Sequence, residues 1–369
     1  MNIKKVVSKK DLKDFITMPA RLYRNDPYWV RPLDMDMFAK FNPKKNPFFE
    51  HAEVQPFIAV ENNKIVGRIA GIINYRHNEV HEEKAAFFGF FESENDVAIS
   101  SRLLDTVCEW AKEKGMSFVR GPANFSSNDE WGLLVDGFDS SPMIMMTYNP
   151  KYYINLIEQS GFVKEKDLLA YILDATAEIP ERLKRAYDII LKRTGVNIRT
   201  LRMNDFENEV KEIQFIYNKA WEKNWGFVPM TENEIQHLAQ ELKPVCDPDL
   251  VFIAEKDNNP VGFAMALPDY NQLLKPLKGK LYPFGIFYLL LNKKKVTAGR
   301  LLTLGLIKEY RNTGIEALFY LKMWEAGKKK GYLEGELSWI LEDNMPMRNG
   351  IEKVGGKVYK TYRIYRKNL

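Results

Sequence analysis

The residues best suited to chemistry form a polar turn in the last fifth of the chain. Glu309–Gly314 follows the apolar run Leu301–Ile307 and precedes an apolar stripe with helical spacing that ends at Gly327. The stripe consists of Ile315, Leu318, Phe319 and Met323. A helix N-terminus leaves backbone N–H groups unpaired and carries partial positive charge, and Arg311 adds a full charge beside it. The turn therefore either cradles a phosphate-bearing ligand or simply caps a helix.

The elements around the turn fit a known pattern. A second strand is expected at Leu333–Ile340, directly after the helix. Arg311–Glu316 resembles the acetyl-CoA loop of the GCN5-related N-acetyltransferase (GNAT) superfamily, Q/R-x-x-G-x-G/A. Later segments resemble the closing part of that superfamily, namely Glu342–Asn344, Ile351–Gly356 and Tyr359–Tyr365.

Two positions depart from the superfamily pattern. Glu316 replaces the last small residue of the loop, where its charge would repel a phosphate. Ile351 stands where many members carry the tyrosine that protonates the departing thiolate.

The resemblance implies a binding site for acetyl-CoA or another acyl-CoA, bound as a substrate and without a metal. The implied residues are Leu306, Ile307, Arg311, Asn312, Thr313, Gly314, Ile315 and Asn344. Backbone donors around Leu306 and Ile307 would stabilise the tetrahedral oxyanion. A primary amine must be neutral to attack a thioester, and Glu342 and Ser338 are the expected base and polar relay.

Composition limits the class of protein. The chain has 369 residues, of which 45% are hydrophobic and 28% charged, as expected of a soluble globular protein with two domains. A net charge of +5 is too small to indicate a nucleic-acid partner. The two cysteines, Cys108 and Cys246, lie far apart and fit a reduced cytoplasmic protein. Met1–Lys5 leads into further charge, so no signal peptide is expected.

Two stretches of the chain repeat each other. Phe57–Gly67 aligns without gaps to Phe252–Gly262 at an interval of 195 residues (252 minus 57), and the same interval places Ile3 on Ile198. We therefore predict an α/β (α+β) fold with two tandem GNAT-like domains, each a mixed, mostly antiparallel sheet flanked by helices. The predicted domains are residues 1–175 and 176–369, with a linker helix at 178–195 and the acyl-CoA loop at 309–316.

The first domain is expected to have lost its cofactor loop. The equivalent segment, Phe91–Ala98, contains three acidic residues and no glycine, which disfavours a diphosphate. Its loop Gly121–Gly132 is rich in hydrogen-bonding side chains, among them Asn128 and Asp129. These residues are expected either to line a substrate cleft or to form a solvated turn, and the turn is favoured.

Two apolar features of the second domain have alternative interpretations. Trp221 and Trp225 are one helical turn apart and belong either to the core, which is favoured, or to the pocket for the acceptor. Tyr282–Leu291 is followed by Lys293–Lys295 and is too short to span a bilayer. It would lie at a membrane interface or bind a long acyl chain, or form a helix buried against its own domain, which is favoured.

The primary hypothesis is an acyl-CoA-dependent N-acyltransferase whose acceptor is a small-molecule or peptide amine. The alternatives are a non-catalytic tandem GNAT protein that binds a ligand or partner, and an aminoacyl-tRNA-dependent transferase. The low net charge counts against the tRNA alternative. His77 and His81 are one helical turn apart, but no third ligand is near them in sequence, so a zinc site is not expected.

Overall fold

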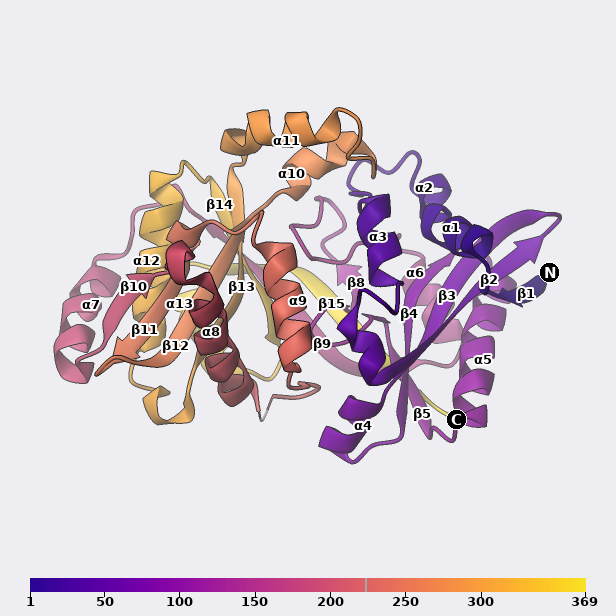
Figure 1. Cartoon of the computed structure of the whole chain (residues 1–369), viewed down its shortest axis with the longest axis horizontal. Helices are drawn as coiled ribbons and strands as arrows, with labels where there is room; N and C mark the ends of the chain where they lie inside the picture. Colours follow the sequence, from indigo (N-terminus) through magenta and orange to yellow (C-terminus); the bar gives the residue numbers. More distant parts are fainter. Residues whose placement is uncertain (223) are drawn as a thin grey trace. The chain divides into compact units, whose positions relative to one another are not determined.

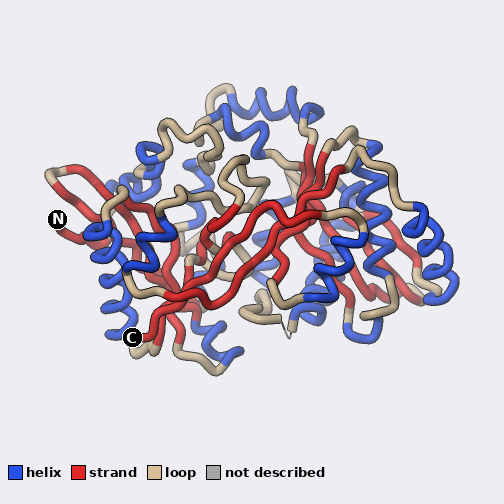
Figure 2. The backbone as a smooth tube through the Cα atoms, turned by 180° about the vertical axis from the view of Figure 1, so that it is seen from behind, coloured by secondary structure: helices blue, strands red, loops and turns tan. Residues whose placement is uncertain are grey.

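The computed structural model describes residues 1–222 and 224–369, and its backbone divides into two compact units. The first unit contains Met1–Leu168, Leu273–Leu290 and Lys360–Leu369, and the second contains Leu169–Gln272 and Leu291–Tyr359. Each unit is a mixed sheet flanked by helices (Figure 1 and Figure 2), which confirms the predicted fold class. The domain boundary predicted at residues 175 and 176 stays a prediction.

The sheet of the first unit has the strand order β1-β2-β3-β4-β5-β15. Neighbouring strands are antiparallel except β4 and β5, which are parallel, and β8 pairs with β15. The strands are β1 (Asn2–Lys5), β2 (Ala52–Glu61), β3 (Lys64–Asn74), β4 (Ala85–Ser93), β5 (Phe118–Gly121), β8 (Leu133–Asp136) and β15 (Lys357–Asn368). A small hairpin joins β6 (Ala123–Asn124) to β7 (Glu130–Trp131).

Helices cover this sheet because its strands alternate apolar side chains between the two faces. On one face, α5 and α6 pack over a core that includes Phe57, Ile69, Phe88 and Val119. The helices of the unit are α1 (Lys9–Thr17), α2 (Pro19–Leu22), α3 (Asp34–Lys40), α4 (Tyr75–His81), α5 (Val97–Glu113) and α6 (Tyr153–Gln159).

The sheet of the second unit has the order β9-β14-β13-β12-β11-β10. Its β13 and β14 are the parallel pair, while β10, β11, β12 and β13 are antiparallel in turn. The strands are β9 (Val163–Asp174), β10 (Asn197–Thr200), β11 (Val251–Lys256), β12 (Asn259–Pro268), β13 (Ala298–Leu306) and β14 (Glu334–Leu341). The strands β13 and β14 therefore lie where the apolar runs predict them.

Two groups of helices enclose the second sheet. On one face, α7 and α12 pack against Phe252 and Ala254, while α8 packs on the other face against Val251 and Ile253. This follows from the alternation along β11. The helices are α7 (Glu181–Thr194), α8 (Phe206–Trp221), α9 (Glu232–Leu242), α12 (Ile315–Lys329) and α13 (Met345–Lys353). Short 3₁₀ turns are at Pro47–Glu50, Met203–Asp205, Pro248–Leu250, Lys275–Leu277, Lys293–Lys295 and Lys308–Tyr310.

Strand register reproduces the sequence repeat. In the first unit Ile3 pairs with Ala59, and in the second unit Ile198 pairs with Ala254. Each residue of the second pair lies 195 positions after its counterpart (198 minus 3 and 254 minus 59). The repeat seen in the sequence is therefore a repeat of strand pairing.

The apolar segment before β13 corrects one expectation. It forms α10 (Asn271–Leu274) and α11 (Gly285–Asn292), and α11 stands at the top of Figure 1. The favoured interpretation of Tyr282–Leu291 was a buried helix, but Phe284 is 78% exposed and Leu291 is 82% exposed. That interpretation is wrong. Among the described residues, none of the helices has both the length and the apolar character needed to cross a membrane.

Candidate active site

The predicted loop leads into a helix whose N-cap residue offers no side chain to the first amides. Gly314 is the N-cap of α12, with φ at 86°, and Asn312 also has a left-handed conformation, with φ at 61°. A non-glycine residue at Gly314 would be strained, and a Cβ there would lie 3.0 Å from Cδ1 of Ile190. The loop therefore turns sharply and leaves backbone N–H groups at a helix N-terminus, as an anion site requires.

Two arginines hold this loop in place. Arg311 donates to the carbonyl oxygen of Ala220 at 2.6 Å and to that of Leu306 at 3.4 Å, which ties the loop to α8 and β13. Arg193, from α7, donates to the carbonyl oxygen of Thr313. The sequence did not point to Arg193, whose only signal was its position near the end of a basic helix. A phosphate-binding role for Arg311 stays a prediction.

The Glu316 carboxyl group occupies backbone N–H groups of the loop that a phosphate would need. Burial raises the pKa of Glu316, while hydrogen bonds from its own N–H and from the N–H of Asn312 oppose that rise. The carboxyl group thus reaches back to the backbone donors that a phosphate would use. The sequence predicted repulsion of phosphate, and the geometry adds direct competition for the same N–H groups.

The fourth strand of the second unit parts from its parallel neighbour. The β13–β14 ladder runs from Ala298 opposite Glu334 to Leu301 opposite Leu337, although both strands continue beyond it. On its other side, β13 shifts register against β12, so that Leu302 is an extra residue between Leu301 and Thr303. Backbone groups near the bulge and the parting strands are thereby withdrawn from regular pairing, which suits the binding of an extended ligand.

A buried polar cluster lies where the strands part. Arg300 Nε donates to Oγ of Ser338 at 2.8 Å and lies 3.3 Å from Oε1 of Glu336. The Ser338 hydroxyl donates to Glu336 Oε1 at 2.5 Å, and the Tyr359 hydroxyl donates to the other carboxylate oxygen. Arg300 is 1% exposed and Glu336 is fully buried. A buried carboxylate joined to a serine hydroxyl is an arrangement that can accept and relay a proton.

The α8 face of β13 supplies further groups. Thr303 pairs with Met265, and directly paired residues point to the same face, which is the face that packs against α8. The Thr303 hydroxyl is buried and has no hydrogen-bond partner among the described residues. A Cβ on Gly305 would overlap the indole ring of Trp221, so Trp221 covers this strand. The buried Thr303 hydroxyl and the indole ring of Trp221 therefore lie on the same face of β13.

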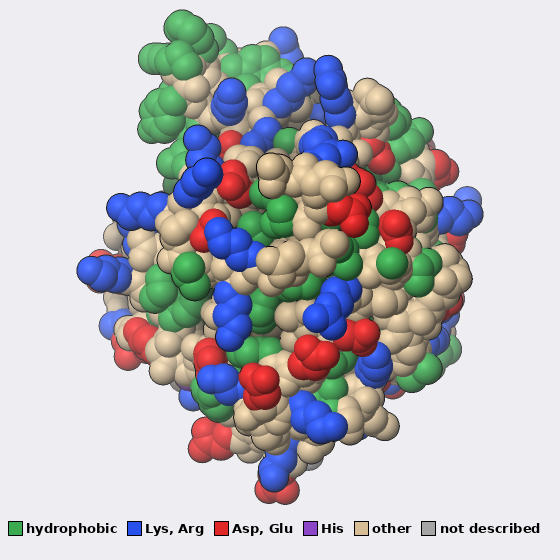
Figure 3. Space-filling view, turned by 90° about the vertical axis from the view of Figure 1, so that its right-hand side faces the viewer, with side chains coloured by type: hydrophobic (Ala, Val, Ile, Leu, Met, Phe, Trp, Pro, Cys, Tyr) green, Lys and Arg blue, Asp and Glu red, His purple; other side chains and the backbone are tan. Residues whose placement is uncertain are grey.

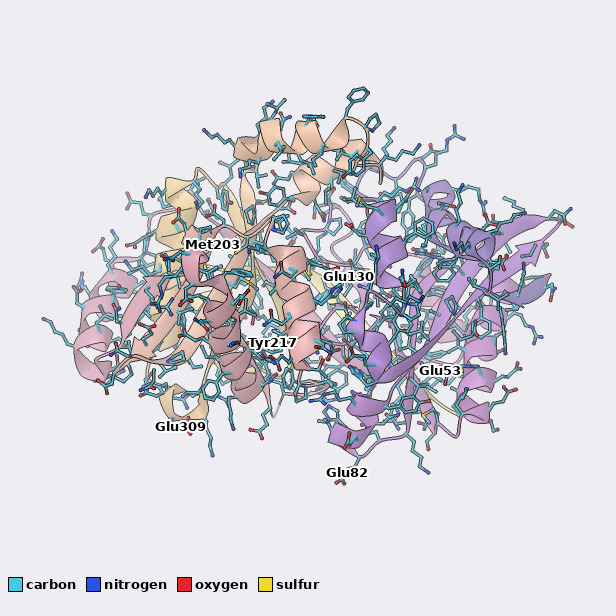
Figure 4. The ribbon with its side chains drawn as sticks, viewed as in Figure 1. Glu53, Glu82, Glu130, Met203, Tyr217 and Glu309 are labelled. Atoms are coloured by element: carbon cyan, nitrogen blue, oxygen red, sulfur yellow. The ribbon has the colours of Figure 1, made fainter. Side chains whose placement is uncertain are left out.

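Only one of the two predicted tryptophans lies on a helix. Trp221 is the last residue of α8, and its ring packs against Tyr217, with centroids 4.8 Å apart, and against Phe263. Because α8 ends there, Trp225 falls in the turn that follows, and the argument that the pair shares a helical face is wrong. Figure 4 labels Tyr217 on α8 and Glu309 in the loop after β13.

The polar loop of the first unit forms a turn. Asp129 accepts from the N–H and the hydroxyl of Ser126, and Lys40 lies 3.2 Å from its carboxylate. The backbone N–H of Asn128 donates to the same serine hydroxyl at 3.2 Å. These bonds form a local turn, but Ser126 is buried and no residue from 121 to 132 is exposed, so the turn is not the solvated one that was favoured. A substrate-binding role for Asn128 and Asp129 stays a prediction.

The remaining predicted residues lie around the start of α13. Glu342 follows the end of β14, and its carbonyl oxygen accepts from Arg348 at 2.6 Å. Asn344 is the N-cap of α13 and accepts from the N–H of Met347. Ile351 is fully buried against Tyr171 and Tyr320. The structure thus joins Ser338 to Glu336, while Glu342 lies in the turn beyond the strand.

Sequence reasoning missed the most closely connected groups of the site, Arg300, Glu336 and Tyr359. Charged residues inside short strands read as solvent-facing positions, and only the apolar residues around Arg300 signalled burial. Ion pairing is what makes their burial tolerable.

Comparison with known proteins gives full-length relatives. No protein-family model matches the chain. The chain is 39% identical over 371 residues to the bacterial ceramide synthase of Caulobacter vibrioides, covering 99% of this chain and 96% of the relative. It is 34% identical over 374 residues to Protein YghO of Escherichia coli, covering 100% and 95% respectively.

Solved structures give the same fold. A tandem GNAT protein from the clavulanic acid biosynthesis pathway aligns over 100% of this chain and 98% of its own, with a TM-score of 0.58. The glucosamine N-acetyltransferase region of a fungal multi-domain β-N-acetylglucosaminidase aligns over 99% of this chain and 38% of its own, with a TM-score of 0.59. Both are 11% identical to this chain, so they show the fold and not the reaction.

Proposed function

The chain belongs to the family of tandem GNAT proteins that includes the bacterial ceramide synthase of Caulobacter vibrioides, and from this premise we propose that it is an N-acyltransferase with a lipid amine as acceptor. A ceramide is the N-acyl derivative of a sphingoid base, a long-chain amino alcohol. The observation that carries the proposal is the similarity to a ceramide synthase along nearly the whole of both chains. The acceptor is then a primary amine on an amino alcohol.

The proposed reaction joins this amine to an acyl thioester. The neutral amine attacks the thioester carbonyl, the C–N bond forms, and the tetrahedral oxyanion accepts a hydrogen bond from the backbone of β13 near Leu306. The N–H of Ile307, the other expected donor, already donates to the carbonyl oxygen of Val261 at 3.0 Å and is therefore not used. The carbon–sulfur bond then breaks, which gives an amide and a thiolate. The amine must lose one proton in this sequence.

We propose that the buried cluster of Arg300, Ser338 and Glu336 accepts the proton that the amine loses. The Ser338 hydroxyl is bonded to Glu336, so a proton taken by serine passes to the carboxylate while Arg300 holds both groups. Glu342, in the turn beyond β14, is the alternative base. The leaving thiolate needs no strong acid, because thiols ionise with a pKa near 8.5, and Ile351 is therefore compatible with turnover.

The proposed donor is an acyl-CoA whose diphosphate binds at the start of α12. The N–H groups of Asn312 and of the residues after Gly314 would receive it, once the Glu316 carboxyl group has left them. Arg193 and Arg311 supply positive charge to the same loop. Acetyl-CoA and long-chain acyl-CoA are both candidate donors.

Turnover of the purified protein tests this function. Sphinganine is incubated with acetyl-CoA or palmitoyl-CoA, and N-acyl product and free CoA are measured by mass spectrometry. We expect product with one donor and its loss in Ser338→Ala. Absence of product with either donor would contradict the proposal and favour the non-catalytic alternative, whereas product formed only from aminoacyl-tRNA would favour the tRNA-dependent alternative.

A further inference from the structure

The segment Tyr282–Leu291, here called the apolar arm, exposes large hydrophobic side chains to solvent. Five of them are more than 60% exposed, which is unusual for side chains of this size. They are Tyr282 (66%), Phe284 (78%), Phe287 (62%), Leu290 (65%) and Leu291 (82%). Figure 3 shows hydrophobic side chains standing out at the top of the molecule, the height at which Figure 1 draws α11.

Four exposed side chains of the apolar arm have helical spacing. Phe287, Tyr288 and Leu291 share one face of α11, and Phe284, directly before the helix, continues the i, i+3, i+4, i+7 pattern. Gly285 lies on the inner side, where a Cβ would be 3.0 Å from the carbonyl oxygen of Lys280. The helix is therefore seated on the preceding segment through a small residue and presents its aromatic and leucine side chains outward.

The charged residues of the segment that contains the apolar arm have a single sign. No aspartate or glutamate occurs from residue 270 to residue 308. Exposed lysines flank the arm on both sides, at Lys278, Lys280, Lys293, Lys294 and Lys295. An apolar centre with a basic rim is the composition that inserts into an interface of anionic lipid headgroups.

We propose that the apolar arm docks the protein on the surface of an anionic lipid bilayer. The arm inserts its aromatic and leucine side chains among the acyl chains, while the lysines contact lipid phosphates. It is too short to cross the bilayer, so it lies at one face of the membrane. The inference goes beyond the proposed function and does not require acyl transfer, although a lipid amine would be met on the same surface.

A second copy of the chain fits the arm less well. A symmetric dimer apposes the same surface patch on both subunits, so five lysines would face five like charges. Anionic lipid supplies the opposite charge at every position of the rim. Charge complementarity therefore selects the bilayer over self-association.

Vesicle flotation of the full chain tests the proposal. Vesicles contain phosphatidylcholine alone or phosphatidylcholine with phosphatidylglycerol, and the bound fraction is measured at low and high salt. We expect flotation with the anionic vesicles that weakens as salt rises. In the triple variant Phe284→Ser, Phe287→Ser, Leu291→Ser, the vesicle-bound fraction should fall at least about tenfold.

Two further variants make the result specific. The triple change Lys293→Glu, Lys294→Glu, Lys295→Glu should abolish the preference for anionic vesicles. A matched control removes three exposed hydrophobic side chains from other elements, Val7→Ser, Val163→Ser and Leu333→Ser, and should float like the wild type. Thermal melts of all variants show whether the fold is retained.

Several results would overturn the proposal. The first is that the wild type does not float with the vesicles. The second is that the triple serine variant of the arm floats as the wild type does, and the third is that the control variant loses as much binding as the arm variant. A wild-type dimer that the arm variant converts to monomer, without vesicle binding, would assign the arm to self-association instead. Acyl transfer to detergent-dispersed amine is measured alongside, so that failed docking with retained turnover leaves the proposed function standing, and the reverse leaves docking standing.

Discussion

In both units the fourth strand pairs with its parallel neighbour only over its first residues and then carries one extra residue, but the polar groups in that region have different partners. In β4 the register against β3 shifts between Arg68 and Ala70, and β4 pairs with β5 only from Ala85 to Phe87. The same shift and short ladder occur in β13. The same strand irregularity is therefore present in both units.

In the first unit, the chain itself occupies this region. The Asn124 side-chain oxygen accepts from the N–H of Phe90 at 2.7 Å, and a Cβ on Gly89 would overlap the carbonyl oxygen of Ala123. In the second unit, the corresponding region has the unsatisfied Thr303 hydroxyl. Two copies of one strand pattern thus differ in whether their polar groups are already satisfied.

The helix that follows the fourth strand shows the same contrast. Asp96 caps α5, and its side-chain carboxylate accepts from the N–H of Ala98 at 2.7 Å. A protein carboxylate therefore already occupies that helix N-terminus. Gly314 provides no side-chain cap for α12, and the longer side chain of Glu316 reaches back to the loop. The two helix N-termini therefore differ in which carboxylate meets their backbone N–H groups. The degenerate cofactor loop of the first unit stays a prediction.

The largest effect is expected from the buried carboxylates. Glu336→Gln should lower kcat by about 100- to 10,000-fold, because the proposed base is lost. The matched variant in the first unit is Glu92→Gln, which removes the carboxylate that pairs with buried Arg68. It should leave kcat unchanged and lower the free energy of unfolding by about 3–5 kcal/mol. Steady-state kinetics and urea unfolding measure both, and equal kinetic losses would contradict the distinction between the units.

The next largest effect is expected on the free energy of unfolding, which should fall at low pH because of His77 in the first unit. Burial lowers the pKa of His77 from 6.5 to about 4, even though its Nε2 lies 3.0 Å from Oε2 of Glu83. The unfolded state therefore binds more protons, so stability contributed by neutral His77 is lost as the pH falls from 6.5 towards about 4. The shift corresponds to about 3 kcal/mol. Urea unfolding across this range should show a shallower pH dependence in His77→Gln.

Removing the competing carboxyl group should improve donor binding. Glu316→Gln is expected to tighten acyl-CoA binding by roughly five- to tenfold, since it removes about 1 kcal/mol of repulsion between like charges. Because the pKa of Glu316 is raised, wild-type affinity should also strengthen as the pH falls and the carboxyl group becomes neutral. Calorimetry at several pH values tests this, and an affinity that is independent of pH in the wild type would contradict it.

The smallest effect concerns the helix cap of the first unit. Asp96→Ala should cost about 1 kcal/mol of unfolding free energy, because the N–H of Ala98 loses its acceptor. Donor affinity and turnover should not change. A gain of a second acyl-CoA site in this variant would show that the capping carboxylate alone had closed the first unit.

Much of the fold could be predicted, because strand periodicity and the repeat are local properties of the sequence. The run Leu301–Ile307, the turn before Gly314 and the helix after it appear in place, and the tandem GNAT fold is confirmed. The exposure of the apolar arm was not predicted, because a hydrophobic run in the sequence does not show whether its side chains pack against protein or face solvent. The pairing of Arg300 with Glu336 also escaped prediction, since it depends on the register of two strands and joins residues 36 positions apart (336 minus 300).

The most direct test of the account is calorimetric titration of acyl-CoA into wild-type protein, Gly314→Glu, Gly314→Ala and Asp96→Ala. Gly314→Ala carries the same backbone strain as Gly314→Glu without the charge, since φ is 86° at this position. We predict one saturable site in the wild type, weaker binding in Gly314→Ala, no binding in Gly314→Glu and unchanged binding in Asp96→Ala. Unchanged affinity in Gly314→Glu, or loss of the site in Asp96→Ala, would contradict the claim that the second unit holds the donor.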